Sequence, residues 1–487
     1  MTHGRAAFGM TRHALAGGIA WVVAASACRA APPPVDARML TDWMRAQYAL
    51  VRAERLSPPV ASRVFAYGAA ALYEGVAAGS PRLRSLAGQL NGLSALPRPE
   101  PRERYDWAIV AASAETTLLK VLFKEGLPAT QVAIAQLGDS QIAARRASGP
   151  VRDRSTAYGA TLGRAIAEWA TGDRFLETRG LAWKPPRGRR YWVNTAEPQQ
   201  YISSSLSAQS EAVSLRNPAD TLTAGAAAER SLIVSRPKSA RIKTLAALNP
   251  TGATEPYWGR LRPFMLTSMD ECAPPPPPPY SEVPGSEFYR QAKAVYDTGS
   301  ALTPEQREIA LYWADNPGES GTPPGHWLLI ASQLVGELQL DAERTAEMLV
   351  LTSVAMADAF ISCWHEKFSW SLIRPVTYIR RVIDPRWHTL ISTPPFPEYT
   401  AGHAVQSGAA AGALTALLGD RPFADSTHVT IGRPVRSFPS FRAAAEEAAR
   451  SRLYGGLHYP VSLTIGTAQG ECIARKVVER IKTRASQ

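Results

Sequence analysis

Long segments with apolar residues at helical spacing fill most of this chain. Five of them, rich in Ala and Leu, run over residues 58–78, 102–123, 157–170, 342–368 and 399–419. Ala and Leu are strong helix formers, and apolar residues that recur every three to four positions place one face of each helix against a core. Alternating strand patterns are scarce. The sequence therefore predicts an all-α fold.

The length and the polar stretches predict how the helices divide. A chain of 487 residues with 45% hydrophobic content can bury one large core or two medium ones. Residues 181–245 are polar and rich in Ser, Arg and Pro, which predicts a surface crossing between two helical halves. We expect two packed helical bundles, an N-terminal half over residues 36–240 and a C-terminal half over 241–487.

The net charge of +12 raises the question of a nucleic-acid partner. No run of Lys and Arg, zinc-finger spacing or aromatic RNA-binding motif accompanies that charge. The sequence therefore argues against nucleic-acid binding. No second long apolar run follows the N-terminal one, which argues against a multi-span membrane domain.

Residues 1–30 have the pattern of a targeting segment. Arg5 and Arg12 precede an apolar stretch that is too short for a comfortable membrane span and ends in small residues. We expect an exported protein, periplasmic or secreted. Cys28 follows Ala-Ser-Ala, which is similar to the lipobox of bacterial lipoproteins, so a lipid anchor at Cys28 and ordinary cleavage nearby both stay open.

Three more cysteines follow, Cys272, Cys363 and Cys472. This odd, widely spaced set describes neither a disulfide framework nor a zinc site. Cys363 lies in an apolar segment and is predicted to be a buried, small hydrophobic side chain. A bridge between Cys272 and Cys472 stays open for an exported chain.

The first of three motifs in the second half of the chain is KFSWSLIRP, with Lys367 and Arg374. The two cations are seven positions apart, close to two helical turns. We expect them on one face of a helix that Pro375 ends, where both would converge on one anion. Two solvated surface cations are the alternative for this pair taken alone.

The second motif, PEYTAGHA, predicts the start of a helix. Thr400 is the expected N-cap, which places Ala401, Gly402 and His403 in the first turn. Gly402 lets the backbone approach an oxyanion, which the free N–H groups of a helix start favour. His403 would then stand beside the anion as an acid or base, with an ordinary surface histidine as the alternative.

The third motif, SRLYGGLHY, completes the set. Ser440 is predicted to cap the helix that carries Arg452 near its C-terminal end, and the following turn presents His458. Together the motifs supply three cations, two imidazoles and free backbone amides. They predict a site for a tetrahedral or trigonal-bipyramidal oxyanion, phosphate or vanadate, between helices of the C-terminal bundle.

The order K-x6-RP, GH, SR-x5-H resembles the signature shared by type 2 phosphatidic acid phosphatases, bacterial class A acid phosphatases and vanadium-dependent haloperoxidases. The haloperoxidase branch is the better match, because YWGRLRPFMLTS, TPEQREIALYWAD and TPPGHW are similar to segments of its bacterial members. Trp364 and Phe396 match the aromatic pair that lines the halide position in the chloroperoxidase type. Asp315 matches, with a one-residue gap, the acid that orients the second arginine, here Arg452.

The resemblance implies that vanadate is held by Lys367, Arg374, Arg452 and the Gly402 amide. His458 would be its direct ligand, His403 would move protons, and Lys367 would polarise the peroxide. The implied reaction partners are hydrogen peroxide, a halide and a small organic acceptor. An acid phosphatase with a histidine nucleophile is the first alternative, because the same cradle binds phosphate. A non-catalytic oxyanion-binding lipoprotein is the second.

Two positions depart from the family pattern. Ala401 stands where the family usually has a serine whose hydroxyl bonds the oxyanion, and Ser462 stands where an Asp usually follows the last histidine by four residues. In the phosphatases that Asp orients the nucleophilic histidine, so its loss bears most on the phosphatase alternative. We expect Ser462→Asp to restore an orienting carboxylate for His458.

Overall fold

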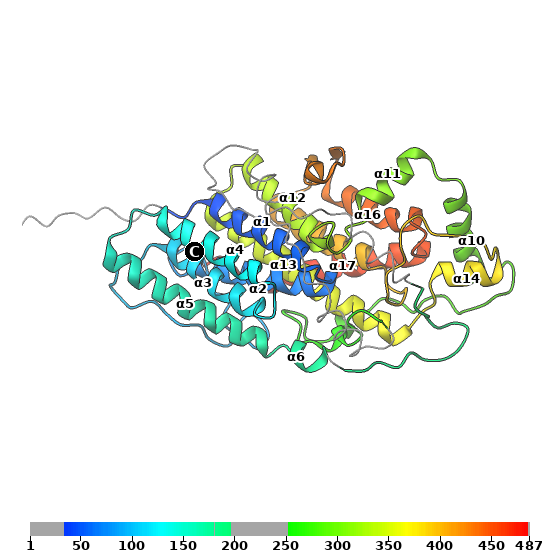
Figure 1. Ribbon diagram of the computed structural model, residues 1–487, viewed down its shortest axis with the longest axis horizontal. Helices are drawn as coiled ribbons and strands as arrows, with labels where there is room; N and C mark the ends of the chain where they lie inside the picture. The colour runs from blue at the N-terminus through cyan, green and yellow to red at the C-terminus, as the bar shows by residue number, and fades with distance from the viewer. Residues whose placement is uncertain (1–33, 180, 196–251, 486–487) are drawn as a thin grey trace, which may run out of the picture. The chain divides into compact units, whose positions relative to one another are not determined.

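The computed structural model describes residues 34–179, 181–195 and 252–485, with its elements labelled in Figure 1. The five segments expected to be helical are confirmed as α2 (Pro58–Ala77), α3 (Trp107–Leu122), α5 (Gly149–Thr171), α13 (Ala342–Trp370) and α15 (Gly402–Leu418). The targeting segment, Cys28 and the predicted boundary between residues 240 and 241 lie outside the described residues.

The remaining described elements are also almost all helical, as the all-α prediction requires. Two short antiparallel strands pair Phe423 with Phe438 and Asp425 with Arg436. The other elements are α1 (Ala37–Glu54), α4 (Pro128–Ala143), α6 (Phe175–Thr178), α10 (Glu287–Ser300), α11 (Pro304–Tyr312), α12 (Thr322–Glu337), α14 (Pro375–Val382), α16 (Phe441–Tyr454), α17 (Pro460–Arg480), the 3₁₀ turns η1 (Trp258–Arg260), η2 (Met269–Cys272) and η3 (Val429–Ile431), and the strands β1 (Phe423–Asp425) and β2 (Arg436–Phe438).

Side-chain caps fix where several helices begin. The Asp106 carboxylate accepts hydrogen bonds from the amides of Ala108 and Ile109 at the start of α3. The Ser440 hydroxyl accepts from the amide of Ala443, which confirms the predicted cap of α16. Each bond satisfies a donor that the first helical turn leaves without a partner inside the helix.

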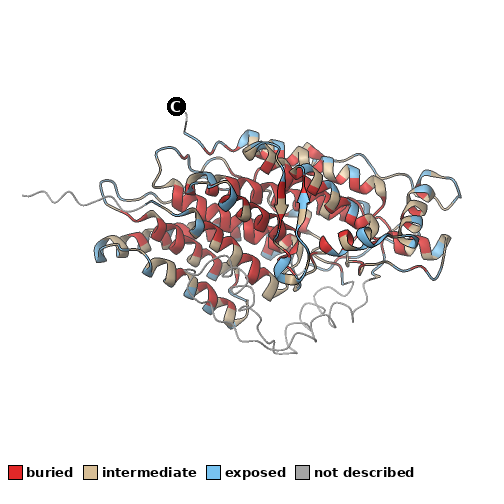
Figure 2. Cartoon of the chain, turned by 90° about the horizontal axis from the view of Figure 1, so that it is seen from above, coloured by how far each residue is buried: buried red, intermediate tan, exposed pale blue. Residues whose placement is uncertain are grey.

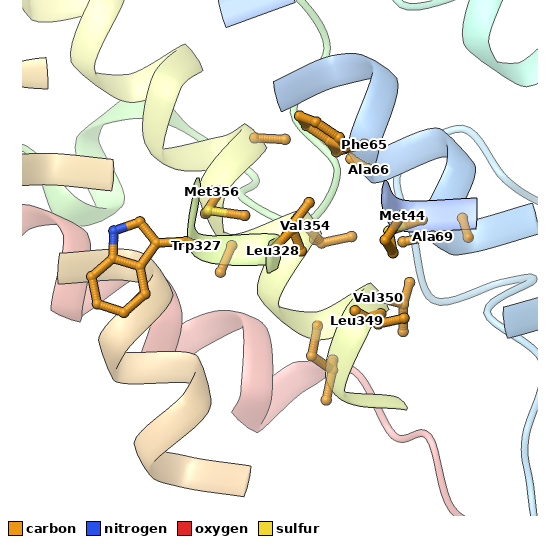
Figure 3. Close-up of a cluster of buried hydrophobic side chains, with 14 of the residues drawn as sticks. Met44, Phe65, Ala66, Ala69, Trp327, Leu328, Leu349, Val350, Val354 and Met356 are labelled. Atoms are coloured by element: carbon orange, nitrogen blue, oxygen red, sulfur yellow. The ribbon is translucent and has the colours of Figure 1, made fainter. Parts of the chain in front are cut away.

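Helix α13 joins the two bundles through one hydrophobic core. It packs against α2 from the N-terminal half and against α15 and α17 from the C-terminal half. Figure 2 shows buried residues along the inward faces of the helices. Figure 3 shows part of this core, in which side chains of α1 and α2 meet those of α12 and α13. The cluster includes Met44, Phe65, Trp327, Leu328, Val350 and Val354.

Among the described helices, α13 is long and apolar enough to cross a membrane. Its most apolar window is 94% buried by the rest of the protein, as expected for the core helix of a folded domain. One of its polar side chains also fixes a loop. The buried Asp358 carboxylate accepts hydrogen bonds from the amides of Phe264, Met265 and Leu266 at 2.6, 2.8 and 3.0 Å.

A disulfide ties that loop region to the last helix. Cys272 in η2 and Cys472 in α17 are bonded across 200 positions of sequence, with their Cα atoms 5.9 Å apart. The bridge left open by the sequence is therefore present. Cys363 is buried and free, as expected. Because the closed loop is long, the bridge removes much conformational freedom from the unfolded chain.

We expect the double variant Cys272→Ala, Cys472→Ala to lower the free energy of unfolding by about 2–5 kcal/mol. Urea denaturation followed by circular dichroism measures the change. The wild-type protein in a reducing agent is the control and should approach the variant. An unfolding midpoint equal to that of the oxidised wild type would show that the bridge adds no stability.

Candidate functional site

The segment between Lys367 and Arg374 is not one helix, which corrects the prediction. Helix α13 ends at Trp370, Ser371 adopts a left-handed conformation, and Arg374 caps the start of α14, so Pro375 begins a helix instead of ending one. The reason is a tertiary contact, because the Ser371 carbonyl accepts from the amide of Trp192 at 2.8 Å. An extended pairing has replaced the last helical turn.

Lys367 and Arg374 nevertheless converge. Both side chains are 0% exposed, so the alternative of two solvated surface cations is wrong. The Lys367 ammonium and the Arg374 guanidinium lie 5.1 and 5.0 Å from the centroid of the Phe396 ring. The fold thus brings the two cations to one aromatic side chain from separate elements.

The start of α15 differs by one residue from the expectation. Ala401 is the N-cap, not Thr400, and its methyl side chain offers no capping bond. The Thr400 hydroxyl instead donates to Gln469 Oε1 at 2.7 Å. Gly402 begins the helix, and a Cβ atom there would lie 3.7 Å from Trp364 and 3.9 Å from Lys367. The missing side chain leaves room beside the free amides of the first turn.

His458 is buried between a carboxylate and a guanidinium. Its Nδ1 lies 2.9 Å from Glu398 Oε1, and its Nε2 lies 3.0 Å from Arg374 Nη1. A carboxylate accepts hydrogen bonds and a guanidinium donates them, so Nδ1 carries the proton and the Nε2 lone pair accepts from Arg374 Nη1. Burial, then the charges of Arg374 and Lys367, hold the pKa of His458 well below its usual range. The ring is therefore neutral, in the tautomer that can bind through Nε2.

The structure reveals Glu398 as a site residue that sequence reasoning missed. Its Oε1 also accepts from the amide of Tyr459 at 3.1 Å, so one carboxylate fixes both the ring and the backbone after it. Burial raises the pKa of Glu398 to about 7, against the lowering effects of Lys367, Arg374 and the Ser462 hydroxyl. Ser462 thus faces a carboxylate supplied by another element. The available signal was a glutamate in PEYTAGHA within an otherwise apolar loop.

The Lys367 ammonium is held by backbone carbonyls. It donates to the oxygens of Pro397 at 3.1 Å, Glu398 at 2.8 Å and Thr400. An ammonium has three donors, and these bonds use all of them. Burial, then the nearby charge of Arg374, lowers the pKa of Lys367 to about 7. Lys367 therefore fixes the loop before α15, and its lowered pKa reduces the positive charge that it carries near neutral pH.

A cavity of about 270 Å³ opens beside these groups. Arg452 lines it and donates from Nη1 to the Trp313 carbonyl at 2.9 Å. Burial, then the charge of Arg452, lowers the pKa of His403 well below its usual range. Its Nε2 has no hydrogen-bond partner among the described residues. The predicted site residues on the cavity wall are Asp315, Trp364, Phe396, Gly402, His403, Arg452 and His458.

Trp364 and Phe396 contact each other at the cavity, and Asp315 lies in a network of buried hydrogen bonds. The Trp364 and Phe396 ring centroids lie 4.9 Å apart, and the indole N–H donates to the Thr254 carbonyl at 3.1 Å. Asp315 is buried and accepts from Ser320 at 2.9 Å, while His326 Nδ1 lies 2.9 Å from its other oxygen. The predicted role of Asp315 in orienting Arg452 stays a prediction.

The arrangement combines a neutral imidazole, helix-start amides and Arg452 on the wall of one cavity, with Lys367 and Arg374 buried behind that wall. Such a donor set binds an oxyanion by shape and charge, and it offers a second imidazole, His403, for proton transfer. Water is largely excluded from the polar groups behind the cavity wall, which strengthens every charge interaction there.

The chain is similar to vanadium-dependent haloperoxidases of known structure. A family model described as "VCPO second helical-bundle domain" matches residues 347–487. A structure described as the first bacterial vanadium-dependent iodoperoxidase is 34% identical, with a TM-score of 0.76, and the match covers 93% of this chain and 98% of that chain. A holo-type bacterial vanadium-dependent chloroperoxidase shares the fold at 14% identity, with a TM-score of 0.62, over 87% of this chain and 92% of that chain.

A curated relative from a fungus covers less of the chain. The vanadium chloroperoxidase of Curvularia inaequalis is 27% identical over 201 residues. The match spans 33% of this chain and 33% of that protein, so this chain covers about a third of the length of that relative.

Above the Glu398 pKa of about 7, we expect Glu398→Gln to weaken orthovanadate binding by about 10- to 100-fold, because the ring loses the ionised partner that fixes its tautomer. Isothermal titration calorimetry in phosphate-free buffer measures the affinity. Glu74→Gln is a matched control, since Glu74 is also buried and accepts from a backbone amide but does not line the cavity. Equal affinities in wild type and Glu398→Gln would contradict the role of Glu398.

The presence of Glu398 reverses the expectation for Ser462→Asp. A second carboxylate beside Glu398 would add like-charge repulsion in a buried place, so we expect a lower melting temperature and no gain in orthovanadate affinity. Thr464→Asp, two positions on and exposed, is the matched control and should melt close to wild type. Tighter binding by Ser462→Asp would show that Glu398 does not already orient His458.

Proposed function

Because this chain belongs to the vanadium-dependent haloperoxidase family, we propose that it oxidises a halide with hydrogen peroxide at a vanadate held by His458. The observation that carries the proposal is the fixed tautomer of His458. Glu398 accepts from Nδ1, which places the lone pair on Nε2; Arg374 Nη1 donates to that lone pair at 3.0 Å, and a bound vanadate would take the place of this hydrogen bond.

The residues fit a vanadate. His458 Nε2 supplies one nitrogen donor, and buried Arg374 and Arg452 supply positive charge. The space that a Cβ of Gly402 would fill lies beside the helix-start amides. Vanadate, when bound, supplies Lewis-acid activation of hydrogen peroxide without a change of oxidation state.

The roles of the other side chains follow from their positions. His403 has a buried Nε2 without a partner among the described residues, and its lowered pKa keeps the ring neutral, so Nε2 can accept a proton from hydrogen peroxide. Lys367 cannot add a fourth bond while all three of its donors hold carbonyls. Its role is to hold the loop before α15.

We infer that iodide is the halide to test first. The 34% identical structure is described as an iodoperoxidase, whereas the chloroperoxidase structures are 14% and 15% identical. Trp364 and Phe396 form an apolar, polarisable wall at the cavity, which suits a large soft anion. The oxidised halogen would then react with a small organic acceptor.

A phosphatase activity is the second candidate. A histidine whose Nδ1–H is held by a carboxylate is also a suitable nucleophile, and the orienting acid that the sequence lacks at Ser462 is supplied by Glu398. That same carboxylate removes one argument for the non-catalytic alternative, which rested on Ala401 and Ser462.

We also propose that the protein is exported, with lipid anchoring through Cys28 as one form. The Cys272–Cys472 disulfide supports this proposal, because such bridges persist in oxidising compartments outside the bacterial cytoplasm. The targeting segment itself lies outside the described residues.

Variants of His458 and His403 should change different quantities, the first the affinity for orthovanadate and the second the turnover rate. We expect His458→Ala to abolish orthovanadate binding and vanadate-dependent iodide oxidation, since it removes the nitrogen ligand. His403→Ala should keep measurable binding but lower kcat by about 10²- to 10⁴-fold, because proton transfer loses its catalyst. Calorimetry measures binding, and iodide oxidation and monochlorodimedone bromination measure turnover.

A nitrophenyl phosphate assay run on the same preparations decides between the two candidate activities. Phosphate hydrolysis without any peroxidase activity in the presence of orthovanadate would favour the phosphatase. Equal loss of affinity in both histidine variants would show that the two roles are wrongly assigned.

A further inference from the structure

A buried cluster of two histidines and two aspartates lies behind the cavity wall. His326, in the first turn of α12, is 0% exposed. Its Nδ1 lies 2.9 Å from Asp315 Oδ2 and its Nε2 lies 2.8 Å from Asp425 Oδ2. The His428 ring stacks on it with centroids 3.8 Å apart. The reaction proposed above does not use His326, Asp425 or His428.

The geometry requires His326 to carry two protons. Both ring nitrogens face oxygens of ionised carboxylates, which only accept, and a neutral imidazole has a single N–H to donate. Burial lowers the pKa of His326, but the charges of Asp315 and Asp425 outweigh it and raise the pKa to about 10. The Trp313 ring stacks on the same imidazole at 4.6 Å and 28°, a position that favours a cation.

A metal ion is the competing interpretation. Three atoms that could bind a metal lie within 4.8 Å of one another, one each from Asp315, His326 and His428. One imidazole lies over the other, however, with the ring centroids 3.8 Å apart and the planes tilted by 33°. Lone pairs lie in the ring planes, so those of two overlapping rings converge poorly on one ion, and both nitrogens of His326 already face carboxylates. The arrangement therefore favours an imidazolium over a metal.

The cluster holds the loop that carries the site. Asp315 belongs to the segment after α11, where the Trp313 carbonyl accepts from Arg452 Nη1. The next residue, Ala314, lines the cavity together with Arg452 and His403. One short stretch of backbone thus accepts a hydrogen bond from the second arginine and lies on the cavity wall with the proton-transfer histidine.

We propose that His326 is a positioning residue, an imidazolium that bridges Asp315 and Asp425 and so fixes the loop against which Arg452 and His403 are set. The proposal rests on the proposed function only in that Arg452 and His403 serve an oxyanion site. It predicts an electrostatic role as well, because the imidazolium offsets the Asp315 charge. The groups whose charges act on His403 are Arg452 and Asp315, with neutral His458 beside them.

The first experiment uses the wild-type protein. Histidine labelled with ¹⁵N reports whether each imidazole carries one or two N–H protons. Among the 8 histidines of the chain, we expect His326 to remain doubly protonated at about pH 8.5, where an ordinary histidine is neutral. A neutral His326 at that pH, or a stoichiometric divalent metal that the purified protein retains and chelators remove, would overturn the proposal.

The second experiment compares His326→Gln with His388→Gln, an exposed histidine away from the cavity. We expect His326→Gln to weaken orthovanadate binding by about tenfold or more. Its kcat profile should also move to higher pH by about half a unit, because Asp315 then acts on His403 without compensation. His388→Gln should change neither. A merely structural role would lower the melting temperature and leave the pH profile in place.

A folded His326→Gln protein with unchanged affinity and pH profile would overturn the proposal. If that variant does not fold, Asp425→Asn removes one of the two carboxylates and should weaken orthovanadate binding in the same direction, while the protonation measurement on wild type needs no variant. If the wild type binds no orthovanadate, the proposed function fails, but the protonation state of His326 still decides the present proposal.

Discussion

Burial of positive charge is the constraint on which the site depends. Lys367 and Arg374 are 0% exposed, and Arg452 is 3% exposed. Removing an ion from water costs several kcal/mol, so every donor that leaves water needs an acceptor. The chain supplies mainly carbonyl oxygens, which neutralise no charge and therefore leave the site positive. These acceptors belong to Trp313, Phe396, Pro397, Glu398, Thr400 and Leu457.

The sequence predicted the helices because their cause is local. Apolar residues at helical spacing over long Ala-rich segments decide both the element and its buried face, and α2, α13 and α15 follow the expected segments closely. The motif order likewise predicted Gly402, His403, Arg452 and His458 in one place, since they line one cavity. Periodicity therefore predicts the helices, and the motifs predict the side chains that line the cavity.

The remaining parts were decided by contacts that no local pattern contains. The end of α13 depends on the pairing of Ser371 with Trp192, and the cap of α15 moved because Thr400 bonds Gln469 across 69 positions. The sequence did not predict the role of Glu398, because its partner His458 is 60 positions away. What the chemistry needs at His458 is an acceptor at Nδ1, and the fold can supply it from any element that passes there.

Helix α13 packs against helices from both halves of the chain, so the two halves depend on each other. Its N-terminal turns pack in the core shared with α2, Asp358 holds the 264–266 loop, and Trp364 and Lys367 stand at the site. The chemistry lies in the C-terminal half, yet its longest support is clamped by helices of the other half. Removal of the N-terminal helices would therefore expose the side of α13 that packs against α2.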